Sequence, residues 1–214
     1  MKRLLGIHAM LCPFKTLEFW EVRRRLGKVD LLLDVGCGDG TQSILFGAGF
    51  VCGVDPVARP RQSHNYRFST EWPSIYSHYD AVTSVCVLEH VDSDIEFLEK
   101  CHESLYNGGK IVLSVDGVHG VGHALKRKHM DDHSVKRYYT RASLLTAMSD
   151  AGFKDIQTKY LLKSRLAKKM FSWCIKRNKF KFPKLLYFPA LWALMIAERR
   201  STGRGMYVIG WGKK

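Results

Sequence analysis

A run of alternating glycines directly after a short apolar segment is the feature that most constrains how this chain can fold. Residues 32–40 read Leu-Leu-Asp-Val-Gly-Cys-Gly-Asp-Gly, so an apolar strand ends in Asp34. The glycines that follow are Gly36, Gly38 and Gly40. Glycine has no Cβ and therefore permits positive φ and a close approach of a ligand to the backbone. The next residues are predicted to start a helix whose first N–H groups point back at that ligand.

A second apolar segment ends in another acid. Residues 50–56 read Phe-Val-Cys-Gly-Val-Asp-Pro, with Asp55 about 20 residues beyond Asp34, the spacing at which an acid accepts hydrogen bonds from ribose hydroxyls. A carboxylate can accept from both hydroxyls at once. Pro56 also favours a capping role for Asp55, and the two roles are compatible. A dinucleotide site would have G-x-G-x-x-G, whereas the third glycine here comes one residue early.

Three segments, in this order, resemble the class I S-adenosylmethionine-dependent methyltransferases. They are 34–40 (Asp-Val-Gly-Cys-Gly-Asp-Gly), 53–56 (Gly-Val-Asp-Pro) and 79–91 (Tyr-Asp-Ala-Val-Thr-Ser-Val-Cys-Val-Leu-Glu-His-Val). The resemblance continues through a helix end and strand at 105–114 and a helix at 138–153, with a last strand at 206–213. It implies a small-molecule methyltransferase-like domain. The implied fold is α/β, a Rossmann-like, doubly wound sheet of seven mostly parallel strands whose last strand is antiparallel.

The length and the alternation of segments agree with one such domain over residues 1–214. A chain of 214 residues with 46% hydrophobic residues forms one domain with a sizeable core. Apolar segments alternate with helical ones, as in a mainly parallel sheet. A basic and apolar helical insertion is expected at 164–200, between the last two strands. The expected strands are 31–35, 51–55, 66–69, 80–85, 110–116, 155–162 and 206–213.

The resemblance implies S-adenosylmethionine as cofactor and a set of contacts to it. The glycine turn lies against the methionine part, and Asp34 orients the ammonium group directly or through water. Many relatives have an acid after the third strand that meets the adenine amine; here Glu71 is its nearest substitute. Cys86 offers backbone contacts near the methyl-bearing sulfur. The predicted cofactor-binding residues are Asp34, Gly36, Cys37, Gly38, Gly40, Asp55, Glu71 and Cys86.

Two histidines are candidate catalytic residues. His90 follows the fourth strand and is a candidate general base, with a helix-start residue bonded to backbone as the alternative. The resemblance implies that His133 shapes the substrate loop or the acceptor site. Methyl transfer needs orientation first, and a base only for a poor nucleophile. His133 belongs to a stretch with other His and Asp residues, but their spacing matches no metal-ligand pattern, so no metal is predicted.

The net charge of +14 favours anionic partners such as nucleic acid, acidic lipid or phosphorylated substrates. Six cysteines without a C-x-x-C pair are expected to be free thiols, as in a reducing cytosol. The apolar start at 1–12 imitates a signal peptide, but His8 interrupts it and no cleavage site follows, so export is rejected. No run is long enough to span a membrane. The expected location is cytoplasmic, with peripheral contact at the inner membrane face.

Residues 157–197 are the most unusual segment. They contain ten Lys or Arg and no Asp or Glu, with aromatic residues between them. The segment ends in an apolar run at 185–197 that Pro189 interrupts. Such a run is too short to span a bilayer but suits an interfacial or buried helix. The alternative is a solvated basic helix followed by one that covers the active site, and both place the segment near the substrate.

Three functions stay open from the sequence. The first is a methyltransferase that acts on a small, lipid-linked or glycan-linked acceptor, at the membrane face. The second is an RNA methyltransferase, which the charge favours; no amine-positioning Asn-Pro-Pro-Tyr-like motif and no RNA-binding module support it. The third is a non-catalytic binding protein of the same fold, suggested by the irregular adenine stretch at 66–73.

Overall fold

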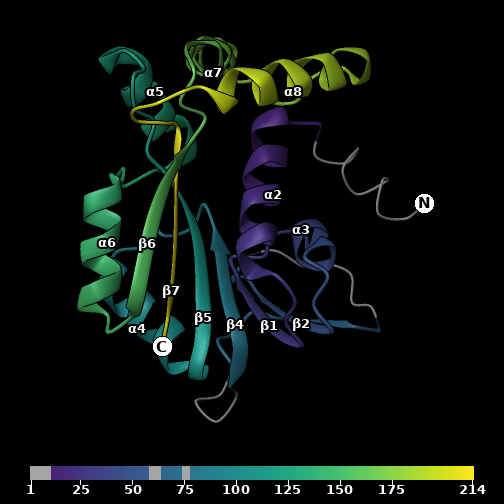
Figure 1. The fold of residues 1–214 in the computed structure, drawn as a ribbon, viewed down its shortest axis with the longest axis vertical. Coiled ribbons are helices and arrows are strands. Elements are labelled where there is room, and N and C mark those ends of the chain that lie inside the picture. Colours follow the sequence, from purple (N-terminus) through teal and green to yellow (C-terminus); the bar gives the residue numbers. More distant parts are fainter. Residues whose placement is uncertain (1–10, 58–63, 74–77) are drawn as a thin grey trace.

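The computed structural model describes residues 11–57, 64–73 and 78–214. The apolar start of the chain, on which the export argument depends, therefore lies almost wholly outside the described residues. Seven strands form one sheet in the order β3-β2-β1-β4-β5-β7-β6 (Figure 1). The strands are β1 (Leu31–Val35), β2 (Phe50–Val54), β3 (Tyr66–Ser69), β4 (Tyr79–Val85), β5 (Leu105–Asp116), β6 (Lys154–Leu161) and β7 (Tyr207–Lys213).

The strand pairing confirms the predicted doubly wound sheet. β1 pairs in parallel with β2 on one side and with β4 on the other. Val35 is in register with both Val54 and Ser84, so the carboxyl ends of these three strands meet at one rim. Ligands of open α/β sheets bind at this rim, where the strand order reverses. β7 runs antiparallel between β5 and β6, as predicted for the last strand.

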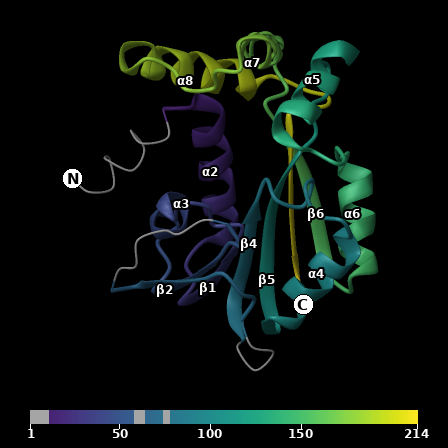
Figure 2. The ribbon, with the colours of Figure 1, turned by 180° about the vertical axis from the view of Figure 1, so that it is seen from behind.

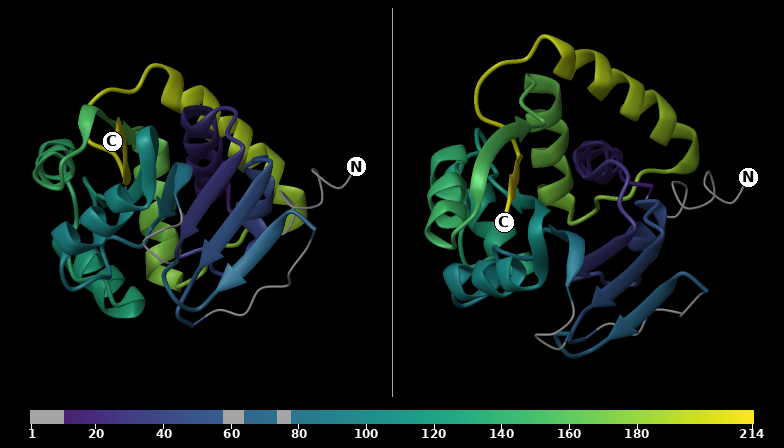
Figure 3. Two further views of the ribbon diagram at one scale, coloured as in Figure 1. Left: turned by 90° about the horizontal axis from the view of Figure 1, so that it is seen from below. Right: turned by 60° about the horizontal axis from the view of Figure 1, so that its bottom comes forward.

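Helices cover both faces of the sheet and also the rim. Seen from behind, α4 and α6 cover the half of the sheet formed by β5, β7 and β6 (Figure 2). α2 and α3 lie on the opposite face, whereas α5, α7 and α8 lie across the end of the sheet (Figures 1 and 3). The helices are α2 (Pro13–Leu26), α3 (Thr41–Leu45), α4 (Asp94–Glu103), α5 (His123–His133), α6 (Arg141–Asp150), α7 (Arg165–Arg177) and α8 (Lys184–Arg199).

Local sequence signals explain where α4 begins but not where it ends. The acids and the serine at 92–94 predict a helix start, and the Ser93 side chain indeed accepts a hydrogen bond from the Glu96 N–H. The Asn-Gly-Gly sequence at 107–109 predicts that this helix ends at Leu105 and Tyr106, which is wrong, because α4 ends at Glu103. Leu105 is fully buried and already pairs with Tyr79 in the sheet. Burial of this side chain outweighs the turn signal of the glycines that follow.

Two helices, α7 and α8, lie between β6 and β7, in the segment where the insertion is expected. α8 continues through Pro189. It packs on the start of α2, where the hydroxyls of Thr16 and Tyr187 form a buried hydrogen bond of 2.7 Å. A separate apolar cluster fills the space beneath these helices and includes Phe14, Phe171 and Tyr207. Among the described residues, no helix combines the length and the apolar character needed to cross a membrane.

Candidate functional site

The three alternating glycines form a turn at the carboxyl end of β1. Gly36, Gly38 and Gly40 have φ values of 74°, 54° and 74°, a region that disfavours other residues. The Gly36 N–H donates to the Val54 carbonyl at 2.7 Å, which fixes the turn against β2. A Cβ on Gly36 would lie 2.1 Å from Val87, whereas a Cβ on Gly38 would meet nothing within 4 Å. Packing therefore requires Gly36, and Gly38 leaves open space for a ligand.

The Cys37 thiol is held inside the protein, where it donates to the Gly38 carbonyl at 3.8 Å. The Cys37 side chain is buried, and its Sγ also accepts a hydrogen bond of 3.3 Å from the Tyr66 hydroxyl. Burial raises the pKa of the Cys37 thiol to about 12. The predicted role of Cys37 is therefore limited to its main chain.

Asp34 lies beneath the start of α3. It is 3% exposed, and its Oδ2 accepts a hydrogen bond of 2.5 Å from the Ser43 hydroxyl. Burial raises the pKa of Asp34 to about 7, although the Ser43 hydrogen bond opposes this shift. A nearby cation would favour the charged form of such a carboxyl. The arrangement therefore suits a residue that faces an ammonium group.

Asp55 joins the end of β2 to the glycine turn. One carboxylate oxygen accepts from the Gly38 N–H at 3.0 Å, and the other accepts from the Val57 N–H at 3.0 Å. The carboxylate therefore caps a bend. The helix that Pro56 is expected to begin is not formed at Pro56 and Val57, so the predicted helix-capping role is wrong for these described residues. A carboxylate oxygen can accept more than one hydrogen bond, so this contact is compatible with one from a ribose hydroxyl.

Glu71 lies at the same rim, one strand further out. β3 ends at Ser69, and the carbonyl of this residue accepts from the Asp55 N–H at 3.2 Å. Glu71 follows two residues later, is exposed, and donates its own N–H to the Ser69 hydroxyl at 3.1 Å. Asp34, Asp55 and Glu71 thus follow the ends of β1, β2 and β3 in turn. Glu71 is the outermost of the three, where the resemblance predicts the adenine contact.

Cys86 lies at the end of β4 in an unusual conformation. Its φ is 54°, a region that non-glycine residues rarely adopt, and its N–H donates to the Ser114 carbonyl at 2.8 Å. The Lys15 Nζ lies 2.8 Å from its Sγ, which itself donates to Glu18 at 3.1 Å. Burial and then Glu18 raise the pKa of Cys86 well above its usual value, so the thiol is neutral.

Two further acids lie beside Cys86; we call Glu18, Glu89 and Asp116 the acidic cluster. The Asp116 N–H, at the end of β5, donates to Glu89 Oε1 at 3.2 Å. Burial is the main cause of the raised pKa values of these two acids, about 7 for Asp116 and about 8 for Glu89. Burial alone would lower the pKa of Lys15, but Cys86 and Glu18 raise it well above its usual value.

The two candidate catalytic histidines line one hollow of about 250 Å³, which we call the acceptor hollow. His90 Nδ1 is 3.2 Å from the Ser134 carbonyl, so the backbone contact of the alternative interpretation is present too. The ring of His133 is centred 4.7 Å from that of His129. Burial lowers the pKa of His129 to about 4. The other residues lining the hollow are Cys12, Lys15, Cys86, Asp116, Phe171, Phe180 and Tyr207.

A second hollow of about 320 Å³ lies beside the glycine turn. It is lined by Asp39 and Thr41, at the turn and the start of α3, and it shares Lys15 and Phe180 with the acceptor hollow. The two hollows therefore meet at these shared side chains. A cofactor bound along the glycine turn would have the acceptor hollow next to its reactive end.

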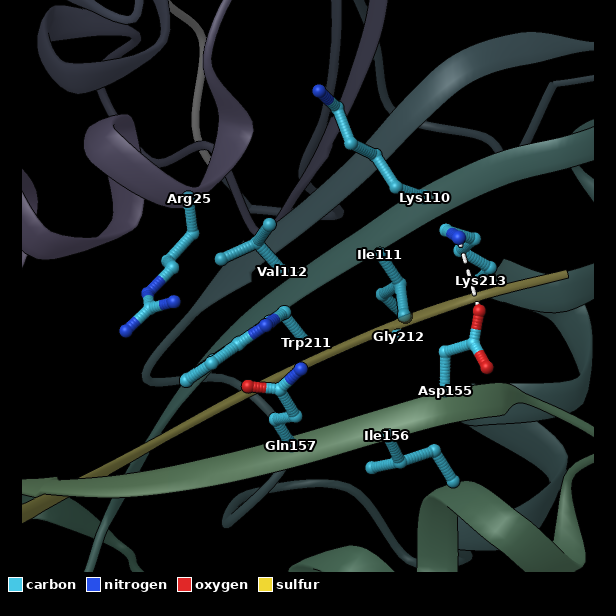
Figure 4. Close-up of a pocket in the computed structure, with 10 residues that line it drawn as sticks. All are labelled: Arg25, Lys110, Ile111, Val112, Asp155, Ile156, Gln157, Trp211, Gly212 and Lys213. Carbon is cyan, nitrogen blue, oxygen red and sulfur yellow. Dashed lines mark hydrogen bonds and ion pairs between the residues drawn. The ribbon is translucent and has the colours of Figure 1, made fainter.

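Another hollow, of about 500 Å³, lies elsewhere (Figure 4). Its walls come from the middle of β5, the start of β6, the end of β7 and Arg25 of α2, towards the amino ends of the parallel strands. The Arg25 guanidinium stacks over the Trp211 ring at 3.5 Å, and Lys213 pairs with Asp155 at 2.9 Å. This end is opposite to the one where open α/β sheets bind ligands. We therefore place the site at the other end.

Sequence reasoning missed four residues of the site: Lys15, Glu18, Glu89 and Asp116. Asp116 ends an apolar strand, as Asp34 does, so the same signal could have found it. Lys15 and Glu18 are one turn apart on α2, but nothing in that spacing indicates that β4 and β5 lie beside them.

Known proteins share the domain and the fold. The family model that matches residues 15–158 describes a methyltransferase domain. A possible histamine N-methyltransferase from Thermotoga maritima has 16% identity, covers 94% of this chain and 89% of its own, and gives a TM-score of 0.63. Geranyl diphosphate C-methyltransferase from Streptomyces coelicolor has 14% identity, 93% and 79% coverage, and a TM-score of 0.64.

Phosphoethanolamine N-methyltransferase 2 from Haemonchus contortus, in complex with S-adenosyl-L-methionine, gives a TM-score of 0.63 at 15% identity. The match covers 92% of this chain but only 52% of the nematode protein, so this chain spans about half of that enzyme. No curated protein matches the sequence significantly.

Proposed function

The chain belongs to the methyltransferase domain family, and from this premise we propose that it methylates a small, lipid-linked or glycan-linked acceptor at the face of an anionic membrane. In family and fold it is a class I S-adenosylmethionine-dependent methyltransferase, as its sequence predicts. The observation that supports the membrane part is the exposed apolar and basic surface of α7 and α8, beside the acceptor hollow.

The residues at the rim fit this cofactor. The open space at Gly38 admits a ligand against the backbone, and Asp55 lies at the position where a carboxylate accepts from ribose hydroxyls. Asp34 takes the ammonium group, and Glu71 the adenine side. When bound, the sulfonium supplies an electrophilic methyl group. The chain's own part is to orient the acceptor in the neighbouring hollow, where His90 and His133 lie, and to exclude water from it.

The outer face of α8 is apolar and exposed. Leu185, Phe188, Trp192 and Ile196 recur at helical spacing and are 86%, 51%, 68% and 47% exposed. The opposite side of α8 is buried and packs on the rest of the protein. Figure 1 shows α8 at one end of the molecule, with no described element beyond it. α8 is thus apolar both on the side that packs on the protein and on the side that faces solvent. A position at the membrane interface would bury the solvent-facing side.

Basic side chains lie next to the start of this face. The turn between α7 and α8 and the helix ends beside it carry five exposed basic residues, and no acid lies between positions 157 and 197. Each basic residue near an anionic surface contributes about 1 kcal/mol of binding. They are Lys176, Arg177, Lys179, Lys181 and Lys184.

The same turn lies at the acceptor hollow. Phe180 lines both hollows of the rim, and Lys181 lines the one beside the glycine turn. A membrane that contacts this turn would therefore lie next to the opening through which an acceptor enters. This continuity favours an acceptor held at the membrane over one that diffuses freely.

Vesicle sedimentation tests the proposal. We expect the protein to bind anionic phosphatidylglycerol vesicles at low salt and neutral phosphatidylcholine vesicles at least tenfold more weakly. The double variant Leu185→Ser/Trp192→Ser should bind anionic vesicles at least tenfold more weakly. Its matched control is Leu145→Ser, a 42% exposed residue on α6, which should bind like the wild type.

The charge is tested in the same assay. Lys176→Glu/Lys179→Glu should weaken binding, and Lys28→Glu, an exposed basic residue outside α7 and α8, should not. Tight, saturable RNA binding by a protein that ignores both kinds of vesicle would contradict the membrane proposal and favour an RNA acceptor.

A further inference from the structure

Three buried carboxyl groups and one ammonium group meet beside the acceptor hollow. Glu18 and Glu89 are fully buried, and Asp116 is 7% exposed. The Lys15 Nζ pairs with Glu18 Oε2 at 2.9 Å. A buried carboxyl without a charged partner either holds a proton or takes a cation. Since Lys15 offers one charge for three acids, Glu89 and Asp116 together can take another positive charge.

One carboxylate oxygen of Glu89 lacks a hydrogen-bond donor among the described residues. This oxygen is Oε2, and it is buried. The Glu89 carboxylate lies in a group with Cys86 Sγ and a carboxylate oxygen of Asp116, all within 4.8 Å of one another. An orphaned buried acceptor is costly, and a positive charge held close to it, at Asp116, would offset part of that cost.

The hollow offers aromatic walls to a cation. Rings of Phe171, Phe180 and Tyr207 line it, with the Phe171 ring centred 5.3 Å from Phe180 and 6.0 Å from Tyr207. The Lys15 Nζ already lies 4.9 Å from the centre of the Tyr207 ring. Aromatic faces attract ammonium groups. His129 does not oppose this attraction, because burial lowers its pKa and keeps the ring neutral.

From these contacts we propose that the methyl acceptor is an amine, which the hollow binds as its ammonium ion against Asp116, with the buried carboxylate of Glu89 next to that of Asp116. This inference rests on the methyltransferase function proposed above. The bound ammonium passes one proton to a carboxylate of the pair. The freed lone pair then forms the N–C bond to the methyl group, and the C–S bond breaks with its electrons remaining on sulfur, which leaves S-adenosylhomocysteine.

The electrostatics of the pair suit this proton transfer. Burial raises the pKa of Asp116 to about 7 and that of Glu89 to about 8. These values approach the pKa of an amine more closely than those of an exposed carboxyl, so the transfer is less unfavourable. A divalent metal would use the same donors, but Lys15 Nζ already lies 2.8 Å from Cys86 Sγ. The geometry therefore favours an organic cation.

Probe binding tests the inference without the unknown acceptor. The protein, first saturated with S-adenosylhomocysteine in a calorimetric titration, is titrated with butylammonium chloride, with 1-butanol and sodium chloride as matched probes. Butylammonium should give a saturable rise in melting temperature, and the other two should not. Its affinity should fall at least tenfold in Glu89→Gln and in Asp116→Asn. Asp155→Asn, a surface acid paired with Lys213, is the matched control and should leave the affinity unchanged.

The affinity for butylammonium should also fall as the pH drops from 8 to 6, because the acid pair takes up protons over this range. The control for this arm is the Glu89→Gln variant, whose dependence should be weaker. The titratable and charged groups that face the pair are Lys15 and Glu18 from α2, Cys86 and His90 after β4, His129 and His133 from α5, Tyr138, and Tyr207 from β7.

The outcomes separate the inference from the proposed function. Binding of S-adenosylhomocysteine without any response to butylammonium, or an equal response to 1-butanol, would overturn the amine and leave the methyltransferase. A response to magnesium or zinc chloride but not to butylammonium would overturn it in favour of a metal. A folded protein that ignores S-adenosylhomocysteine would instead overturn the methyl-transfer function.

Discussion

The two sides of the sheet's carboxyl rim are built by different means. On the side of β1 and β2, the surface offered to a ligand is mainly backbone, at glycines that adopt positive φ, with Asp55 held by the Gly38 N–H. On the side of β4 and β5, the surface consists of side chains. Its charges come from α2, from the loop after β4 and from the end of β5.

The difference separates two kinds of specificity. A backbone turn recognises a ligand by shape and tolerates few substitutions, since a Cβ would occupy the space that the ligand needs. A cluster of buried acids recognises charge, and it responds to pH and to the removal of a single partner. The comparison therefore predicts that the affinity for the cofactor is most sensitive to the ligand-facing glycine of the first side, and that the loss of a single charged partner costs most stability on the second side.

The largest expected effect is that of Gly38→Val on the affinity for S-adenosylmethionine. The new side chain would enter the space that is open within 4 Å of this position. We expect the affinity to fall about 100-fold, or about 3 kcal/mol. Isothermal titration calorimetry measures it, with circular dichroism as the check that the variant is folded.

The matched control is Gly36→Ala, two residues earlier. Here the Cβ would meet Val87 at 2.1 Å, so the fold is affected first, by about 1–3 kcal/mol. Some loss of stability is expected in both variants, because both glycines have positive φ. Full affinity for S-adenosylmethionine in a folded Gly38→Val variant would contradict the assignment of Gly38 to the cofactor.

The next largest effect is expected at Lys15, on the other side. Lys15→Met removes the partner of Glu18 and leaves the acidic cluster without a positive charge. We expect the free energy of unfolding to fall by about 2 kcal/mol, below the full value for a buried pair because the Lys15 side chain is 32% exposed. Urea denaturation at pH 7.5 measures this loss.

The control lies on the same helix. Arg24 pairs with Glu21 at 2.6 Å, but its side chain is 58% exposed, so Arg24→Met should cost less than about 1 kcal/mol. Equal losses of unfolding free energy in Lys15→Met and Arg24→Met would mean that removing a charged partner costs no more in the acidic cluster than at the surface.

The smallest effect is a dependence of stability on pH between about 6.5 and 8. Burial raises the pKa of Asp34 and Asp116 to about 7 and that of Glu89 to about 8, whereas these carboxyls are already ionised in the unfolded chain. The folded protein therefore holds protons that the unfolded chain has lost, and its free energy of unfolding falls as the pH rises through this range. Buried histidines such as His129 act below this range, in the opposite direction.

Two substitutions divide this pH dependence of stability between the glycine turn and the acidic cluster. Asp34→Asn should remove the part that belongs to the glycine turn, and Glu89→Gln should remove part of that from the acidic cluster. Urea midpoints at pH 6.5 and pH 8 give the measurement. A wild type that is more stable at pH 8 than at pH 6.5 would show that these carboxyls are not protonated in the folded state.

The sequence was sufficient for the sheet because its signals are local. The strand ending in Asp34, the glycines after it and the strand ending in Asp55 lie within one short segment. They therefore predict the turn, and the resemblance that they help to carry implies the doubly wound sheet. The end of α4 was predicted wrongly because the burial of Leu105, a tertiary effect, outweighs the glycines that follow.

The acidic cluster could not be predicted in the same way. Glu18 and Asp116 lie almost a hundred residues apart, and only the packing of α2 against the ends of β4 and β5 brings them together. His90 and His133 were predicted singly, and the hollow that they share results from the position of α5 beside the rim. Residue type indicates what each group can do, but its neighbours depend on the fold.

The way α7 and α8 are attached has a further consequence. The chain leaves the sheet at Leu162 and returns at Met206, and the Met206 N–H donates to the Leu162 carbonyl at 3.3 Å. Both helices therefore form an insertion that leaves and re-enters the sheet at two neighbouring points. The entropic cost of closing such an insertion grows only slowly with its length. Homologous proteins could therefore carry a different insertion here, and with it accept a different substrate, while the strands kept their register.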